Sequence, residues 1–330
     1  MTLRLHGDTL AAPGMLDFAV NVWPGERPAA LRAALAAALD DPRYPDDRGA
    51  RAALARRHGR TPDEVLALNG ATEAFWLLAH ALRPRVVACV DPSFTEPEAA
   101  LRACGADVIA VARDPRDWPF EPAAVPPEAE VVVLGNPNNP TGALDAPETV
   151  LALLRPGRLV IVDEAFMDFV PGEGPSLAGR RCEGLVVVRS ATKLWSLAGV
   201  RAGYLLGPPS LVARLQAHRQ PWSVNALALA ALIVCARDAA TRHRVAWQVA
   251  AARAALLARL SALPRVRAWP SAANFLLLQV PDGQATIAGL RAAGIAVRPA
   301  ASFPGLTEDH MRVAVRRPAD NERLAEALGA

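Results

Sequence analysis

Five short apolar runs between residues 85 and 188 alternate with segments of helical pattern, and this alternation restricts the fold more than any other feature of the chain. A strand buried on both faces reads as a continuous apolar run. Alternation of such strands with helices is typical of a mostly parallel sheet covered by helices on both faces. We therefore expect an α/β fold whose strand ends meet along one edge of the sheet. The runs are Arg85–Val90, Ala106–Val111, Glu130–Leu134, Leu159–Val162 and Leu185–Val188.

The pattern changes after Tyr204. A long helical segment over residues 240–260 precedes short strand patterns that alternate with two further helical ones, and this predicts a smaller α+β domain. No Gly/Ser-rich linker marks the junction, so we expect the long helix to join the two domains. The predicted division is an N-terminal arm and helix (1–44) that belongs with the small domain, a large domain (45–235) and a small C-terminal domain (236–330).

Composition and charge exclude several classes of protein. Hydrophobic residues make up 52% of the 330 residues, and the net charge of +3 comes from 36 basic and 33 acidic residues that are mixed along the chain. Because there is no basic block with interleaved aromatic residues, we expect no nucleic-acid partner. The four cysteines are well separated, which argues against a zinc site or a disulfide framework and fits a reducing cytosol. We expect no bound metal.

Neither the beginning of the sequence nor its most apolar stretch predicts a membrane protein. The first eight residues lack the apolar run of a signal peptide. The longest apolar stretch, residues 224–236, is interrupted by Asn225 and is too short to span a bilayer. We therefore expect a soluble, cytoplasmic protein with no membrane partner.

Lys193 ends the segment Ser190-Ala-Thr-Lys, which directly follows one of the apolar runs. Open α/β sheets bind their ligands at the carboxyl ends of the strands. A partly desolvated lysine amine there has a lowered pKa and can form a Schiff base with an aldehyde. Arg201 follows eight residues later and could reach an anion held beside the lysine. Taken alone, a solvated loop lysine is the commoner interpretation, so the hypothesis depends on residues elsewhere.

A second candidate is the glycine turn Gly70-Ala71-Thr72, which opens a helical pattern. Unpaired backbone N–H groups and the helix dipole make such a turn an anion site, although an ordinary helix start is the commoner interpretation. Upstream, Thr61-Pro-Asp-Glu64 has an N-cap threonine, a proline at the first helical position and a glutamate at the third. This pattern predicts the start of a helix there.

Asp163 ends another apolar run, and a carboxylate in such a place is costly unless it is paired. A pyridinium N–H is such a partner, and a fixed carboxylate would keep that nitrogen protonated. Asn139 could bond a phenolic oxygen on the same ring, and Phe94 could stack on its face. Taken one at a time, Asp163 is more commonly a helix cap, Asn139 a turn residue and Phe94 a core residue. Together with the lysine and the anion site, they supply every group that pyridoxal 5′-phosphate requires.

The motifs N-P-x-N-P-T-G at residues 136–142, D-E-A-F at 163–166 and S-x-T-K at 190–193 resemble those of the fold-type I aminotransferase superfamily, class I/II. The similarity runs over nearly the whole chain. Within the superfamily the chain is most similar to the threonine-phosphate decarboxylases of cobalamin synthesis and to the histidinol-phosphate aminotransferases. The resemblance implies an aspartate aminotransferase-like fold, with a large cofactor-binding domain on a mostly parallel seven-stranded sheet and a smaller α+β domain. It also implies a homodimer with shared active sites.

The resemblance further implies a role for each matching residue. Lys193 would bind the cofactor covalently, Asp163 would contact the pyridine nitrogen, and Asn139 would donate to the ring oxygen O3′. Phe94 would stack on the ring, and Tyr44 would reach the cofactor phosphate of the neighbouring subunit. The implied phosphate ligands are Gly70, Ala71, Thr72, Ser190 and Arg201, and the implied substrate ligands are Arg312 for the carboxylate, Arg298 and His6 for a phosphate, and Asn21 and Asn274 in the same pocket.

These expectations lead to a first functional hypothesis, the decarboxylation of O-phospho-L-threonine to aminopropanol phosphate. The alternative is an aminotransferase acting on histidinol phosphate or a related amino acid. The choice depends on which Cα bond the pocket holds perpendicular to the cofactor ring, which the sequence does not fix. A third hypothesis, a non-catalytic cofactor-binding sensor, is disfavoured because Lys193 and Arg312 are present and no DNA-binding region is appended.

Two residues depart from the pattern of the superfamily. Phe166 stands where many aminotransferases have a tyrosine that bonds the cofactor O3′. Trp23 stands where the usual N-terminal motif has a small polar residue. The first departure predicts a higher pKa for the lysine–cofactor linkage than in those enzymes, and the second bears on the substrate.

Overall fold

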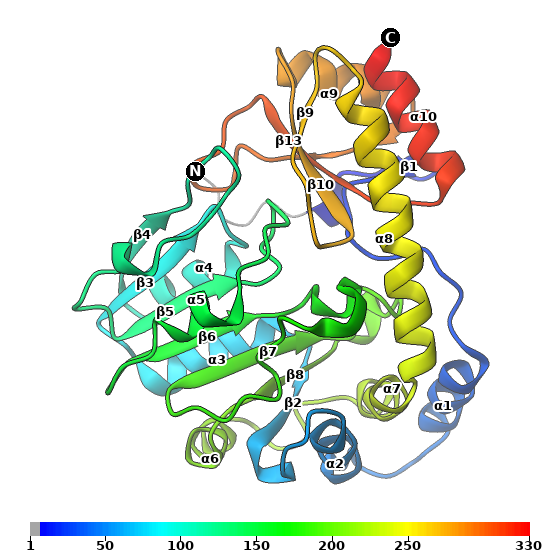
Figure 1. The fold of residues 1–330 in the computed structure, drawn as a ribbon. Helices are drawn as coiled ribbons and strands as arrows, with labels where there is room; N and C mark the ends of the chain where they lie inside the picture. Colours follow the sequence, from blue (N-terminus) through cyan, green and yellow to red (C-terminus); the bar gives the residue numbers. More distant parts are fainter. Residues whose placement is uncertain (1–6) are drawn as a thin grey trace.

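The computed structural model describes residues 7–330, and its central element is a seven-stranded sheet with the order β2-β8-β7-β6-β5-β3-β4 (Figure 1). β8 runs antiparallel to both of its neighbours, β2 and β7, and the other neighbouring strands are parallel. The predicted mostly parallel α/β sheet is therefore confirmed. Its strands are β2 (Val65–Asn69), β3 (Val86–Asp91), β4 (Asp107–Ala112), β5 (Val131–Gly135), β6 (Leu159–Asp163), β7 (Leu185–Ser190) and β8 (Ala202–Leu206).

Helices cover both faces of this sheet, as the continuous apolar strands require. In β7, Leu185 and Val187 pack into one apolar core, whereas Val186 and Val188 pack into the other. The core beneath Val186 is completed by α3 (Thr72–Leu82), α4 (Glu96–Ala103) and α6 (Pro209–Ala217). The opposite core is completed by α2 (Arg48–Arg57), α5 (Pro147–Leu151) and α7 (Ala226–Arg237).

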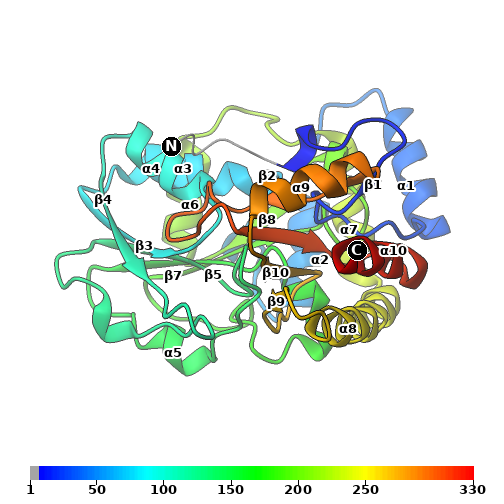
Figure 2. The ribbon, with the colours of Figure 1, turned by 90° about the horizontal axis from the view of Figure 1, so that it is seen from above.

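The C-terminal part of the chain forms a smaller α+β layer beside the large sheet. Its four-stranded sheet has the order β12-β13-β10-β9 and packs against α8 (Ala239–Ser261), which extends from α7 to this layer (Figure 1). Seen from above, α8 and α10 (Pro318–Gly329) lie side by side (Figure 2). The other helix and the strands of this C-terminal part are β9 (Arg267–Ala268), β10 (Phe275–Gln279), α9 (Gly283–Ala292), β11 (Ile295–Ala296), β12 (Arg298–Pro299) and β13 (His310–Ala314).

The N-terminal segment contacts both parts of the molecule. β1 (Leu16–Asp17) pairs in parallel with β11, whereas α1 (Ala29–Leu39) packs against α7. We therefore keep the division at residues 44/45 and 235/236 as a proposal. Within residues 7–330, no helix has the length and apolar character needed to cross a bilayer.

One local prediction was wrong. The helix start at Thr61 is a single 3-10 turn, Pro62–Glu64, that leads directly into β2. The predicted capping box does form, since the Thr61 N–H donates to Glu64 Oε2 at 2.8 Å. The helix does not continue because residues 65–68 are fully buried in the sheet, and tertiary burial overrides the local helix signal.

Candidate active site

The predicted cofactor residues gather at the carboxyl edge of the large sheet. Asp163 is the last residue of β6 and Ser190 the last of β7, while Asn139 and Phe94 lie on the loops that follow β5 and β3. One cavity brings together every predicted cofactor ligand except Gly70 and Tyr44. Its lining consists of Ala71, Thr72, Phe75, Phe94, Asn139, Asp163, Ala165, Phe166, Ser190, Thr192, Lys193 and Arg201.

Lys193 lies in this cavity with an amine suited to reaction at neutral pH. Burial lowers the pKa of Lys193 to about 8, and the positive charges of Arg312 and Arg201 act in the same direction, whereas Asp163 opposes them. The Phe166 ring lies 6.0 Å from Nζ. The motifs do not use one further fact that supports this assignment: Lys193 is the only lysine in the 330-residue sequence.

This pKa predicts how the cofactor-free protein takes up an aldehyde. Only the neutral amine attacks a carbonyl. Below pH 8 the rate of colour formation with pyridoxal 5′-phosphate should therefore rise about tenfold per pH unit, and above pH 8 this rate should become constant. Stopped-flow absorbance measures this profile. In Arg312→Gln the midpoint should move to higher pH because one repelling charge is lost. A wild-type midpoint near the ordinary lysine value would contradict the buried amine.

Asp163 faces the same cavity as a desolvated carboxylate. Burial raises the pKa of Asp163 to about 6, partly opposed by the Ala165 N–H, which donates to Oδ1 at 3.0 Å, and by the charge of Lys193. Among residues 7–330 this N–H is the one hydrogen-bond donor that it has. A protonated ring nitrogen would supply the missing partner, so the carboxylate fits the pyridine end of pyridoxal 5′-phosphate.

One end of the cavity is formed by Ala71 and Thr72 at the start of α3 and by the Arg201 side chain, which lies against Gly70. Gly70 has φ +83°, and a Cβ placed there would lie 2.4 Å from Nη2 of Arg201. The Ser190 and Thr192 hydroxyls lie 2.7 Å apart on the opposite wall. Backbone N–H groups at a helix start, a guanidinium and two hydroxyls are the donors that a phosphate group needs.

Gly70→Ala should weaken cofactor binding by about tenfold or more, because its Cβ would displace Arg201; the left-handed backbone adds a stability cost of roughly 1–2 kcal/mol. Gly105→Ala is the matched control, since Gly105 has φ +86° but open space around the Cβ position. Both variants should lose similar stability, and only Gly70→Ala should lose cofactor affinity in a fluorescence titration. Equal affinities would exclude the contact with Arg201 as the cause.

A second, more open cavity continues from the first and shares Lys193, Asn139 and Arg201 with it. Arg312 on β13 lines it, and its guanidinium donates to Asn139 Oδ1 at 2.6 Å and to the Ala19 carbonyl at 2.8 Å. With the Asn21 amide turned so that its oxygen faces Arg312, that oxygen accepts bonds of 3.0 and 3.2 Å. The bond to Arg312 leaves the NH₂ group of Asn139 as the donor toward the cavity.

Arg298 lies directly opposite Arg312 in the register of β12 and β13, and it lines the same cavity. Burial lowers the pKa of Arg312 to about 9, with repulsion from Arg298 as the next cause. Burial also lowers the pKa of Arg298 to about 10. No carboxylate of the described residues forms an ion pair with Arg312. Two neighbouring, partly desolvated guanidiniums therefore mark the place where an anionic substrate group would bind.

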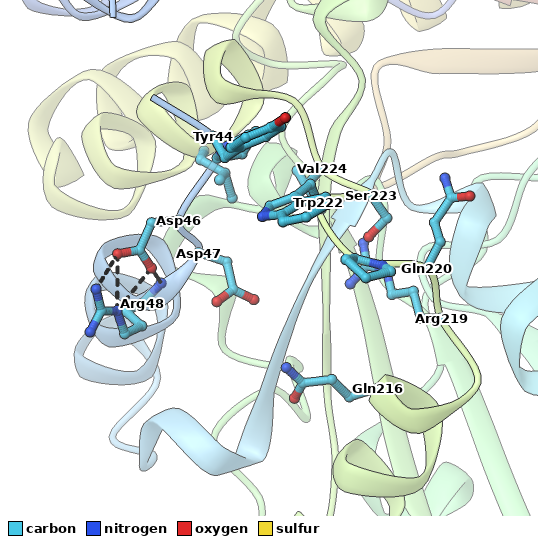
Figure 3. Close-up of a pocket in the computed structure, with 13 residues that line it drawn as sticks. Tyr44, Asp46, Asp47, Arg48, Gln216, Arg219, Gln220, Trp222, Ser223 and Val224 are labelled. Atoms are coloured by element: carbon cyan, nitrogen blue, oxygen red, sulfur yellow. Dashed lines mark hydrogen bonds and ion pairs between the residues drawn. The ribbon is translucent and has the colours of Figure 1, made fainter. Parts of the chain in front are cut away.

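Among the described residues, three predicted ligands line neither cavity: Gly70, Asn274 and Tyr44. Asn274 is fully buried and lines neither cavity; its amide donates to the Asn21 carbonyl at 3.0 Å, so the prediction that it lines the pocket is corrected to a contact behind Asn21. Tyr44 lies in a separate groove, 75% exposed, with its ring stacked on Trp222 at a centroid distance of 4.6 Å (Figure 3). His6 lies outside the described residues.

A buried ionic network beneath the site was not predicted. Arg189, only 1% exposed, contacts Glu164 at 2.9 Å and Glu173 at 2.5 Å and also pairs with Asp168. Arg57 of α2 pairs with Asp168 at 2.7 Å. Because Glu164 follows Asp163 and Arg189 precedes Ser190, the network fixes the ends of the two strands that carry the site.

Comparison with known proteins agrees with the geometry. The family model described as aminotransferase class I and II matches residues 13–328. The chain is 45% identical over 319 residues to a histidinol-phosphate aminotransferase of Mycobacterium tuberculosis, covering 95% of this chain and 87% of the relative. It is 35% identical over 333 residues to the threonine-phosphate decarboxylase of Salmonella typhimurium, with coverages of 95% and 90%. The crystal structure of the histidinol-phosphate aminotransferase from Clostridium acetobutylicum superposes with a TM-score of 0.90 at 24% identity, covering 95% of this chain and 98% of that one.

Proposed function

The chain belongs to the class I and II aminotransferase family, whose cofactor is pyridoxal 5′-phosphate, and from this premise we propose that it is an aminotransferase for a phosphate-bearing substrate of the histidinol-phosphate type. The observation that carries the proposal is the arrangement of Lys193 between Asp163 on one side and Arg312 on the other, in continuous cavities. The relative with 45% identity supports the choice of substrate.

Each residue of the site has a definite task in this proposal. When bound, the cofactor supplies an electron sink for the bond that breaks at the substrate Cα. Arg201, Ser190 and the turn at Gly70 would hold its phosphate, and Asp163 would keep its ring nitrogen protonated. The Lys193 amine, neutral above pH 8, would take the proton from Cα and deliver it to the former aldehyde carbon of the cofactor, on the other side of the nitrogen. Arg312 and Arg298 hold the anionic group of the substrate and so fix its orientation.

A second candidate is the decarboxylation of O-phospho-L-threonine. Two adjacent guanidiniums, Arg298 and Arg312, suit a substrate with two anionic groups, and phosphothreonine carries both a carboxylate and a phosphate. A carboxylate held perpendicular to the ring leaves as CO₂, with the proton supplied to Cα by the lysine or by water. The relative with 35% identity supports this candidate.

The active enzyme in this proposal is a homodimer. Tyr44 is highly exposed and lies apart from the cofactor cavity of its own chain, which fits its delivery to the cofactor phosphate of a second copy. Sedimentation should give a dimer. Mixing a Tyr44→Phe chain, which should bind the cofactor more weakly, with an inactive Lys193→Ala chain should restore part of the lost activity, because one site of the mixed dimer then has both residues.

Separate incubations with the two substrates test the function. With histidinol phosphate and 2-oxoglutarate, the enzyme should form glutamate, and omission of 2-oxoglutarate should stop turnover. Release of CO₂ from O-phospho-L-threonine without 2-oxoglutarate would support the second candidate and overturn the first. A change in cofactor absorbance without turnover of either substrate would instead revive the sensor hypothesis.

A further inference from the structure

A third cavity, of about 470 Å³, lies on a part of the molecule that the reaction does not use. It is bounded by the segment between β1 and α1, which runs beside α8 in Figure 1, by the amino-terminal half of α8, and by the loop that follows Lys193. It shares no lining residue with the cofactor or the substrate cavity. A ligand here would therefore not compete directly with the cofactor or the substrate.

The lining of this cavity is strongly basic. Four arginines line it against a single carboxylate, that of Glu26, and no carboxylate within residues 7–330 forms an ion pair with any of the four. Exposed arginines elsewhere, at positions 43, 48 and 116, instead pair with an aspartate two residues away. The four are Arg27, Arg32, Arg244 and Arg317.

Backbone carbonyl groups hold three of these side chains in place. Arg27 donates to the Ser196 carbonyl at 3.1 and 2.7 Å. Arg32 donates to the Arg27 carbonyl at 3.0 Å, and Arg317 to the Pro24 carbonyl at 3.1 Å. A carbonyl fixes a guanidinium without neutralising it, so the positive charges stay concentrated around the cavity. Fixed guanidiniums are well suited to binding phosphate oxygens in pairs.

Trp195 lies in the lining of the cavity with a side chain that is 2% exposed. Its indole N–H is itself buried and does not face the cavity, so it is no part of the site's donor set. The polar side chains of Thr241 and Gln248 line the same cavity. The four guanidiniums, with these polar side chains beside them, are donors for oxygen atoms that carry negative charge.

We propose that this cavity is a binding site for a small anion with at least two negative charges, of the phosphate or phosphate-ester class. The bound anion would connect the N-terminal segment through Arg27, α8 through Arg244, and the start of α10 through Arg317. Trp195, in the lining of this cavity, lies two residues after Lys193, so the anion would bind next to the loop that carries Lys193.

Titration of the holoenzyme with pyrophosphate at constant ionic strength, read by tryptophan fluorescence, tests this proposal, since Trp23 and Trp195 line the cavity. The wild-type protein should give a saturable change. Arg244→Gln should bind at least about tenfold more weakly, because a charge-assisted bond to phosphate is lost. Arg265→Gln, at an exposed arginine outside the cavity, is the matched control and should bind as the wild type does.

Two further variants keep the test decisive. If Arg244→Gln does not fold, Arg32→Gln takes its place, since Arg32 is exposed on α1. Arg312→Lys should leave the titration unchanged, and loss of the signal in that variant would assign the anion to the substrate cavity and overturn the proposal. The absence of a saturable change, or equal affinity in Arg244→Gln and the wild type, would also overturn it.

Discussion

Lys193→Ala should lose turnover by a factor on the order of 10⁴ or more, because the amine that acts covalently is removed. Lys193 is the only lysine of the sequence, so no neighbouring lysine can substitute for it. The variant should fold normally, since Nζ forms no hydrogen bond or ion pair within the described residues. Steady-state kinetics with circular dichroism as the folding check measures both expectations.

Lys193→Arg provides the control for charge. It keeps a cation in the cavity but has no nucleophilic amine, so it should be as inactive as the alanine variant. Added methylamine should restore part of the activity of Lys193→Ala, in which the removed side chain leaves space, and should not restore that of Lys193→Arg. Turnover in either variant near the wild-type rate would show that the amine takes no part in the reaction.

Asp163→Asn should reduce turnover about 10³-fold, the size of effect expected when one preorganised electrostatic contact of the transition state is removed. The amide keeps the shape of the side chain, and its oxygen can still accept the Ala165 N–H, but it carries no charge to keep the ring nitrogen protonated. Cofactor affinity should fall much less than turnover. We expect Asp163→Glu to recover part of the rate, because it restores the charge at a slightly wrong position.

Two other results would change the role assigned to Asp163. If Asp163→Asn lost cofactor and turnover in equal measure, Asp163 would be a structural ligand and not an electronic one. Measuring cofactor content together with kcat separates the two roles. A rate unchanged from the wild type would remove Asp163 from the site.

The large sheet and the position of the cofactor cavity could be predicted from the sequence because both follow from local patterns. Buried parallel strands give uninterrupted apolar runs, and the residues at their carboxyl ends must meet at one edge. Asp163, Ser190 and Lys193 are placed by this rule alone. The same rule does not apply at residues 61–64, where a good helix start is followed by residues that the sheet buries.

Contacts between distant residues could not be predicted. Asn274 lies behind Asn21, 253 positions away in the chain, and no local pattern encodes this pairing. The buried ion pair between Arg189 and Glu164 also joins residues that are distant in the sequence. From the sequence alone, an arginine at the end of a strand is expected to be exposed. Thr192 lines the cofactor cavity from within the S-x-T-K motif and could have been selected from that motif.

The central claim is that Lys193 binds the cofactor covalently. The mass of the holoenzyme after reduction with borohydride and digestion tests this claim most directly. Reduction makes a lysine–cofactor linkage permanent. We therefore expect one phosphopyridoxyl group per chain, on the peptide that contains Lys193. The visible absorbance of the protein should disappear at the same time. An adduct on the N-terminal amine, or a protein that stays colourless with the cofactor and gains no mass on reduction, would contradict the account.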